Sequence, residues 1–197
     1  MSTKPVLTYF GVRARGEFIR VLNHYLGVDF EDVRVATIDD TLRSKTTFGQ
    51  LPIYQDGQFL LSQTGAIARY IAEKHNFLGK TPVERARVNE SIDSAFDIMS
   101  AFSRSRAIPE EAEKFKSQVI PRFLNSYEKL LTVNKHIAGG DDYTLADIFV
   151  FNIVDYIETL GHSEIVKPYV KVQEHLTYFR AHPKLSKYLK ERPESKF

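Results

Sequence analysis

The chain of 197 residues contains no cysteine and no tryptophan. The lack of cysteine excludes disulfide bonds, thiolate metal sites and a cysteine nucleophile. Any sulfur chemistry carried out by this protein would therefore use a sulfur atom that a ligand supplies. Long apolar runs are also missing: none approaches the ~20 residues of a membrane-spanning helix, so we expect no membrane partner.

A large excess of one charge is likewise missing, because the formal net charge is only +2 and acids and bases are interspersed along the chain. The densest basic cluster, Arg13, Arg15 and Arg20, is too small to form the basic stripe of a nucleic-acid groove. We therefore expect no nucleic-acid partner. The first residues lead into a strand-like run without the apolar segment of a signal peptide, which predicts a cytoplasmic protein.

Residues 5–78 alternate short strands and helices. Alternating side chains predict a strand ending at Phe10, and apolar residues at helical spacing over 18–26 predict a helix that stops at Gly27. A second alternating run covers 30–35. A strand, a helix and a strand within about 30 residues form a βαβ unit, so these two strands are expected to be parallel.

Residues 36–48 are polar and predict an irregular loop. Two apolar runs, 52–54 and 59–61, are joined through Asp56-Gly57, which is a strong hairpin signal. Helical spacing returns over 63–74. The first part of the chain is therefore expected to be a small mixed sheet with helices.

Beyond Lys80-Thr81-Pro82 the periodicity is almost wholly helical, and Pro121 is expected to start or kink a helix. Thr144 to Asp147 has the pattern of a capping box, in which the hydroxyl and the acid satisfy free backbone N–H groups. The fold class is thus α/β plus all-α. Helices are expected over 84–102, 111–131, 148–160, 171–180 and 183–192.

Three positions of the first part could carry chemistry, and each has a structural alternative. Tyr9 is either a half-buried strand residue or a hydroxyl at the strand edge, where ligands collect. Pro52 either opens an edge strand, where proline is tolerated, or forms a cis peptide bond that turns the Leu51 backbone towards a peptide ligand. Gln63 and Thr64 are either helix caps or an anion site at a helix start.

The other polar residues show no established catalytic or metal-binding pattern. Asp93 and Asp97 share a helix face and could hold a divalent ion, but two solvated acids are commoner. No histidine has metal-ligand spacing, so no metal is expected. Four histidines are expected at the surface: His136, His162, His175 and His182.

Several segments together resemble those of a known family, the cytosolic glutathione transferases, and most closely the sigma-like group that is related to haematopoietic prostaglandin D synthases and S-crystallins. The resemblance covers essentially the whole chain. It implies a thioredoxin-like domain over 1–79 and an all-helical domain over 80–197, in a homodimer. The segments are 7–10, 13–17, 48–52, 63–70, 144–147 and Arg192-Pro193.

The resemblance implies roles for single residues, with glutathione as co-substrate and no other cofactor. Tyr9 resembles the tyrosine that donates a hydrogen bond to the glutathione sulfur, and Arg15 the arginine that supports the thiolate. Asp97 matches an acid that reaches glutathione across the dimer. The other implied glutathione-binding residues are Phe10, Arg43, Gln50, Leu51, Pro52, Gln63 and Thr64.

The helical domain is implied to supply a pocket for a hydrophobic electrophile. Many sigma-like members hold the glycyl carboxylate with a tryptophan, whose place falls near Asp39 here, and Arg43 is the expected replacement. The implied activity is conjugation. A prostaglandin-type isomerase or peroxidase, and a binding or structural relative, are the alternatives. The implied pocket residues are Phe10, Ala14, Met99, Arg104, Phe149, Ile153 and Phe197.

Overall fold

The computed structural model describes residues 4–195, and contacts between residues divide the chain into two compact units. The first unit comprises the chain up to His75 together with the residues from Pro183 onward, and the second comprises Asn76–His182. The C-terminal residues group with the first unit because the last helix packs on its first helix. The domain limits at 79 and 80 remain a prediction from the sequence.

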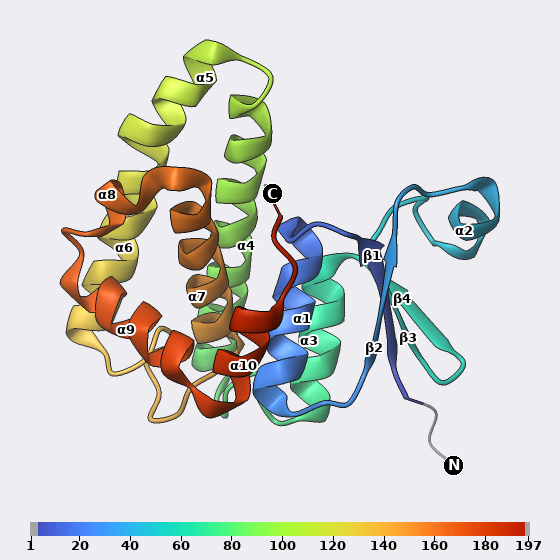
Figure 1. Ribbon diagram of the computed structural model, residues 1–197. Helices are drawn as coiled ribbons and strands as arrows, with labels where there is room; N and C mark the ends of the chain where they lie inside the picture. Colours follow the sequence, from blue (N-terminus) through green and yellow to red (C-terminus); the bar gives the residue numbers. More distant parts are fainter. Residues whose placement is uncertain (1–3, 196–197) are drawn as a thin grey trace. The chain divides into compact units, whose positions relative to one another are not determined.

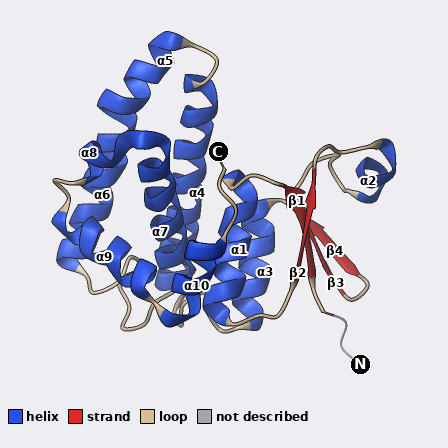
Figure 2. Ribbon diagram, viewed as in Figure 1, coloured by secondary structure: helices blue, strands red, loops and turns tan. Residues whose placement is uncertain are grey.

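A four-stranded mixed sheet with the strand order β2-β1-β3-β4 forms the centre of the first unit. Strands β1 and β2 pair in parallel, as the βαβ pattern predicted, and β3 pairs antiparallel with both β1 and β4. Figure 2 shows the strands as one group. The strands are β1 (Val6–Phe10), β2 (Glu31–Val35), β3 (Ile53–Asp56) and β4 (Phe59–Ser62).

Helices α1 and α3 contact each other and the strands of the sheet. Helix α1 ends where the sequence predicted, because Gly27 adopts a left-handed conformation with φ of 74° and its N–H caps the helix. The loop predicted over 36–48 is wrong in part. It contains α2, which begins after Asp39 because that carboxylate accepts a hydrogen bond from the Leu42 amide at 2.7 Å. The helices are α1 (Ala14–Leu26), α2 (Asp40–Lys45), α3 (Thr64–Lys74) and α10 (Pro183–Glu191).

The second unit is helical throughout its described residues (Figure 1). Its central helix α7 is completely buried, from Leu145 to Ile157, and packs mainly against α4. None of the helices within residues 4–195 combines the length and the apolar character needed to cross a membrane. The elements are α4 (Pro82–Ser105), α5 (Pro109–Lys114), α6 (Ile120–Val133), α7 (Leu145–Ile157), α8 (Ser163–Val166) and α9 (Val170–Ala181), with π-helical turns at Phe115–Val119 and Glu158–His162.

Two sequence predictions for the second unit are confirmed by the structure. The capping box is confirmed, since the Thr144 amide donates to the Asp147 carboxylate at 2.8 Å and the Thr144 hydroxyl caps the helix. The prediction that Pro121 starts or kinks a helix within 111–131 is also confirmed. Helix α6 begins at Ile120 with Pro121 in its first turn, directly after a π-helical turn, because proline has no N–H to continue the α-helical hydrogen bonds.

Candidate active site

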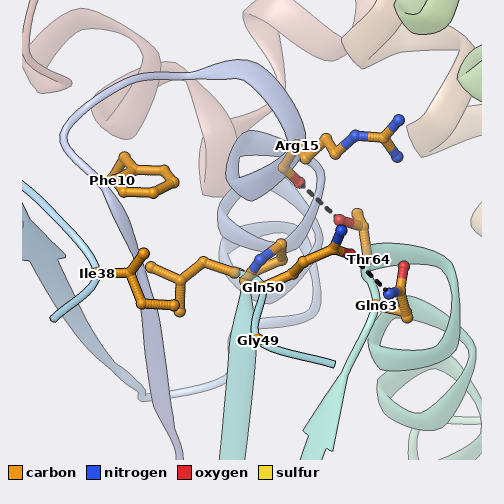
Figure 3. A pocket seen from close by; sticks show the side chains of 9 residues that line it. Phe10, Arg15, Ile38, Gly49, Gln50, Gln63 and Thr64 are labelled. Atoms are coloured by element: carbon orange, nitrogen blue, oxygen red, sulfur yellow. Dashed lines mark hydrogen bonds between the residues drawn. The ribbon is translucent and has the colours of Figure 1, made fainter. Parts of the chain in front are cut away.

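A cavity of about 430 Å³ lies in the first unit at one end of its sheet. Its walls come from the end of β1, the start of α1, the segment before β3 and the start of α3 (Figure 3). Segments that are distant in the sequence therefore meet at one place. The lining residues are Phe10, Arg15, Ile38, Gly49, Gln50, Leu51, Pro52, Gln63 and Thr64.

Leu51 and Pro52 are joined by a cis peptide bond at the entry to β3. The sequence was compatible with an edge-strand proline and with a cis peptide bond, and the structure has the cis peptide bond. Pro52 is buried, whereas Leu51 keeps partial exposure, and both line the cavity. The predicted peptide-binding backbone of Leu51 thus belongs to a residue on the cavity wall.

Gln63 precedes the first turn of α3 and has an unusual backbone conformation, with φ of 73°. Its side chain does not cap the helix but donates to the Gln50 side-chain oxygen at 3.2 Å (Figure 3). Such strained residues cluster at functional sites. The Thr64 hydroxyl donates to the Arg15 carbonyl oxygen at 3.4 Å, which joins the starts of α3 and α1. The start of α3 therefore offers backbone N–H groups and a dipole that favour an anion.

Tyr9 lies one residue before the end of β1 and is only 6% exposed. It does not belong to the residues that line the cavity, but it lies next to Arg15, which does. Burial raises the pKa of Tyr9, although a backbone hydrogen bond with Arg15 and the charges of Arg15 and Arg20 oppose this rise. Its hydroxyl is consequently protonated at neutral pH and able to donate a hydrogen bond.

Gly16 makes room for the Tyr9 ring, because a Cβ atom at this position would overlap the ring atoms. The close approach of α1 to β1 therefore requires glycine here. Arg15 precedes it, and in Figure 3 its guanidinium group extends to the side away from Phe10 and Ile38. Ala14 is the first residue of α1, is partly exposed and has a positive φ of 33°.

Two lining residues, Ile38 and Gly49, were missed by the sequence reasoning. Ile38 is an isolated apolar residue within a polar segment, which was its only signal. Gly49 has a φ of 65°, and its carbonyl oxygen accepts a hydrogen bond from Arg43 at 3.3 Å. Arg43 itself is exposed on α2 and contacts a wall residue without lining the cavity.

The remaining predicted site residues belong to the second unit or lie outside the described part. Asp97 and Arg104 are exposed on α4, and Met99 is buried on the same helix. Phe149 and Ile153 have no exposed surface, and Phe149 packs edge-on against Phe96. Their roles stay predictions. Phe197 lies outside the described residues.

Residues 4–195 contain no cluster of three or more histidine or acidic side chains that could bind a metal ion. Asp93 and Asp97 are both exposed on α4. The surface placement predicted for the histidines is wrong for His136 and His175, which are 3% and 8% exposed. Packing around the capping box buries them: His136 contacts the Tyr143 ring, and His175 lies 3.5 Å from the Asp147 carboxylate.

Residues 5–73 match the N-terminal domain of glutathione S-transferases, and residues 93–192 match their C-terminal domain. The chain belongs to the glutathione S-transferase family. A putative glutathione S-transferase alpha-2 of Dictyostelium discoideum is 40% identical over 202 residues, with 100% of this chain and 98% of the relative covered. Enzymes of this family use glutathione as co-substrate.

Solved structures agree with this assignment. A glutathione S-transferase of Caenorhabditis elegans is 30% identical with a TM-score of 0.85, covering 98% of this chain and 100% of the other. Prostaglandin synthase D of Nilaparvata lugens is 25% identical with a TM-score of 0.86 and covers 98% and 100%. The expected fold, a thioredoxin-like domain followed by helices, is confirmed.

Proposed function

We propose that the cavity of the first unit binds glutathione and that this transferase conjugates its sulfur to hydrophobic electrophiles. The observation that carries the proposal is the convergence of Arg15, Leu51 and Thr64, from three separate segments, on one cavity wall. Each of them was assigned to glutathione from the sequence. We further propose a sigma-like class and a cytoplasmic location.

Each end of the tripeptide has a matching feature. The γ-glutamyl carboxylate is placed at the start of α3, where N–H groups and the helix dipole favour an anion and where Gln63 and Thr64 stand. The cysteinyl backbone is placed beside Leu51. The glycyl end is placed towards Gly49 and Arg43, whose guanidinium group is held at the Gly49 carbonyl oxygen.

The chemical task is to form a thiolate near neutral pH. A free thiol with a pKa near ~8.5 is only about 3% ionised at pH 7. Lowering this pKa by ~2 units requires about 2.7 kcal/mol of differential stabilisation. One hydrogen bond from a hydroxyl to an anion supplies ~1.5–3 kcal/mol. The Tyr9 hydroxyl, assisted by the positive charge of Arg15, is therefore sufficient. The thiolate then attacks the electrophilic carbon, a carbon–sulfur bond forms, and the leaving group departs with its electron pair.

Calorimetry tests glutathione binding directly. The parent protein is expected to bind at sub-millimolar concentration. Thr64→Ala is expected to weaken binding about 10-fold, because we propose that the Thr64 hydroxyl exchanges its weak 3.4 Å bond to the Arg15 carbonyl oxygen for one to the glutathione carboxylate, and a hydrogen bond to a charged group contributes roughly 1.5 kcal/mol. Gln58→Ala is the matched control, since Gln58 is an exposed polar residue of the β3–β4 turn. Absence of binding by the parent protein at millimolar glutathione would overturn the proposal.

We also propose a homodimer in which Asp97 of one protomer approaches glutathione bound by the other. Phe48 is 63% exposed in the single chain, and phenylalanine is one of the residue types that are enriched in protein–protein interfaces. Sedimentation at micromolar concentration is expected to give twice the chain mass, and Phe48→Ser is expected to shift the equilibrium towards the monomer. A parent chain that sediments as a monomer would remove Asp97 from the site. Such a state has precedent, as a hookworm relative with 27% identity is described as monomeric.

A second candidate reaction is a glutathione-dependent isomerisation of a prostaglandin endoperoxide. The similarity to prostaglandin synthase D of Nilaparvata lugens, with a TM-score of 0.86, favours it. It uses the same thiolate and therefore the same residues of the first unit. The choice between the two depends on the electrophile that the protein accepts.

A further inference from the structure

The C-terminal segment of the chain returns to the loop between Tyr9 and Arg15. Helix α10 packs on α1, and after it the Ser195 hydroxyl accepts a hydrogen bond from the Arg13 backbone amide at 3.4 Å. Both partners belong to the first unit. The closing Arg192-Pro193 motif, to which the proposed chemistry assigns no role, lies in this segment.

Arg20 of α1 holds the same loop through hydrogen bonds to its backbone. Its guanidinium group donates to the carbonyl oxygens of Val12 at 2.8 Å and Phe10 at 3.1 Å, and to the Asp32 carboxylate at 3.0 Å. The Arg20 residue has no exposed surface, and its guanidinium carbon lies 5.7 Å from the centre of the Tyr9 ring. One buried guanidinium group thus fixes, by hydrogen bonds, the loop that separates the two proposed catalytic residues.

Glu17 connects this cation to the C-terminal helix. Its carboxylate is 3.4 Å from the Arg20 guanidinium group and accepts hydrogen bonds from the Tyr188 hydroxyl at 2.9 Å and from Arg192 at 3.0 Å. Burial and the Glu17 carboxylate raise the pKa of Tyr188, which keeps this hydroxyl a donor. The side chains of Arg20, Glu17 and Arg192 are 1%, 4% and 8% exposed and Tyr188 is half-buried, so water competes weakly for their hydrogen bonds.

We propose that Tyr188 and Arg192 are positioning residues that, through Glu17 and Arg20, hold the loop 10–13 and thereby the Tyr9 hydroxyl and Arg15 in the geometry needed to stabilise the thiolate. This inference rests on the proposed function of Tyr9. Displacing a catalytic group by a fraction of an ångström lowers the rate far more than it weakens substrate binding. The expected signature is a loss in kcat with a nearly unchanged KM for glutathione.

Tyr188→Phe removes one hydroxyl and leaves the ring stacked on His24. It is expected to lower kcat about 3–10-fold and to move the rising limb of the pH–rate profile to higher pH, because a weaker hydrogen bond raises the pKa of the bound thiol. Arg192→Ala is expected to act in the same direction. Arg192→Lys is expected to restore much of the loss, since an ammonium group can still donate to Glu17.

Arg180→Ala is the matched control, because Arg180 also pairs with two acids, buried Asp155 and partly exposed Glu158, but within the second unit. It is expected to lower the melting temperature without moving the pH profile. In a Tyr9→Phe background, Arg192→Ala is expected to lower kcat by a clearly smaller factor than in the parent protein, because one of the two groups through which it acts is already missing.

The outcomes separate the two proposals. Should Tyr9→Phe lower turnover while Tyr188→Phe and Arg192→Ala keep the parental kcat and pH profile, the positioning role is wrong and the proposed function stands. A full additional loss from Arg192→Ala in the Tyr9→Phe background would also overturn the positioning role. Should Tyr9→Phe leave turnover unchanged, the proposed function itself fails.

Discussion

Tyr9→Phe is expected to lower the turnover number for conjugation about 10–100-fold, as follows from the loss of ~1.4–2.7 kcal/mol of transition-state stabilisation. The physical reason is that phenylalanine keeps the ring against Gly16 but removes the one donor proposed for the sulfur. Glutathione affinity is expected to change little, because the carboxylates and backbone of the tripeptide are held elsewhere. The measurement is steady-state kinetics with glutathione and an activated aryl chloride.

Tyr54→Phe is the matched control for this experiment. Tyr54 is also a buried tyrosine of the sheet, on β3, paired with Leu7 of β1, but its hydroxyl lies 3.5 Å from the Asn23 side-chain oxygen and not beside Arg15. Its loss is expected to leave turnover within about twofold, since no catalytic contact is removed. Parental turnover in Tyr9→Phe would contradict the role of the hydroxyl. A parent protein that turns over an endoperoxide but no aryl chloride would favour the isomerase.

Asp147→Ala is expected to have the largest effect on stability, about 3–5 kcal/mol, because it removes a helix cap and leaves buried donors unpaired. Its carboxylate accepts hydrogen bonds from the backbone amides of Ile137 at 3.0 Å and Thr144 at 2.8 Å and has no exposed surface. Both donors would lose their partner in the variant. For a chain of this size the melting temperature is expected to fall by roughly 6–20 °C.

Asp142→Ala is the matched control, because it removes an acid from the loop before the same helix. Asp142 pairs with Lys80 at 2.6 Å, but both side chains are mostly exposed. An exposed ion pair contributes roughly 0–1 kcal/mol, so the melting temperature is expected to change by at most a few degrees. Equal melting temperatures for the two variants would show that the capping box does not stabilise the second unit.

Local patterns predicted most of the fold. The parallel β1–β2 pair, the β3–β4 hairpin at Asp56-Gly57 and the end of α1 at Gly27 follow from the identity of neighbouring residues, and all are confirmed. The start of α6 at Pro121 was predicted as well, whereas the preceding π-helical turn was not, because such a turn depends on packing as well as on the residues themselves. The short helix α2 was missed since a single carboxylate at Asp39 starts it.

The candidate site, too, was predicted in part from the sequence and decided in part by tertiary packing. By itself the sequence determined which residue types stand at the strand ends and helix starts, because local backbone chemistry places Tyr9, Pro52 and Gln63 there. Only the tertiary structure decided that the Leu51–Pro52 bond is cis, that Ile38 completes the wall, and that Arg192 reaches Glu17. Such contacts join residues far apart in the chain, and they depend on how helices and strands pack, which the periodicity of one segment does not specify.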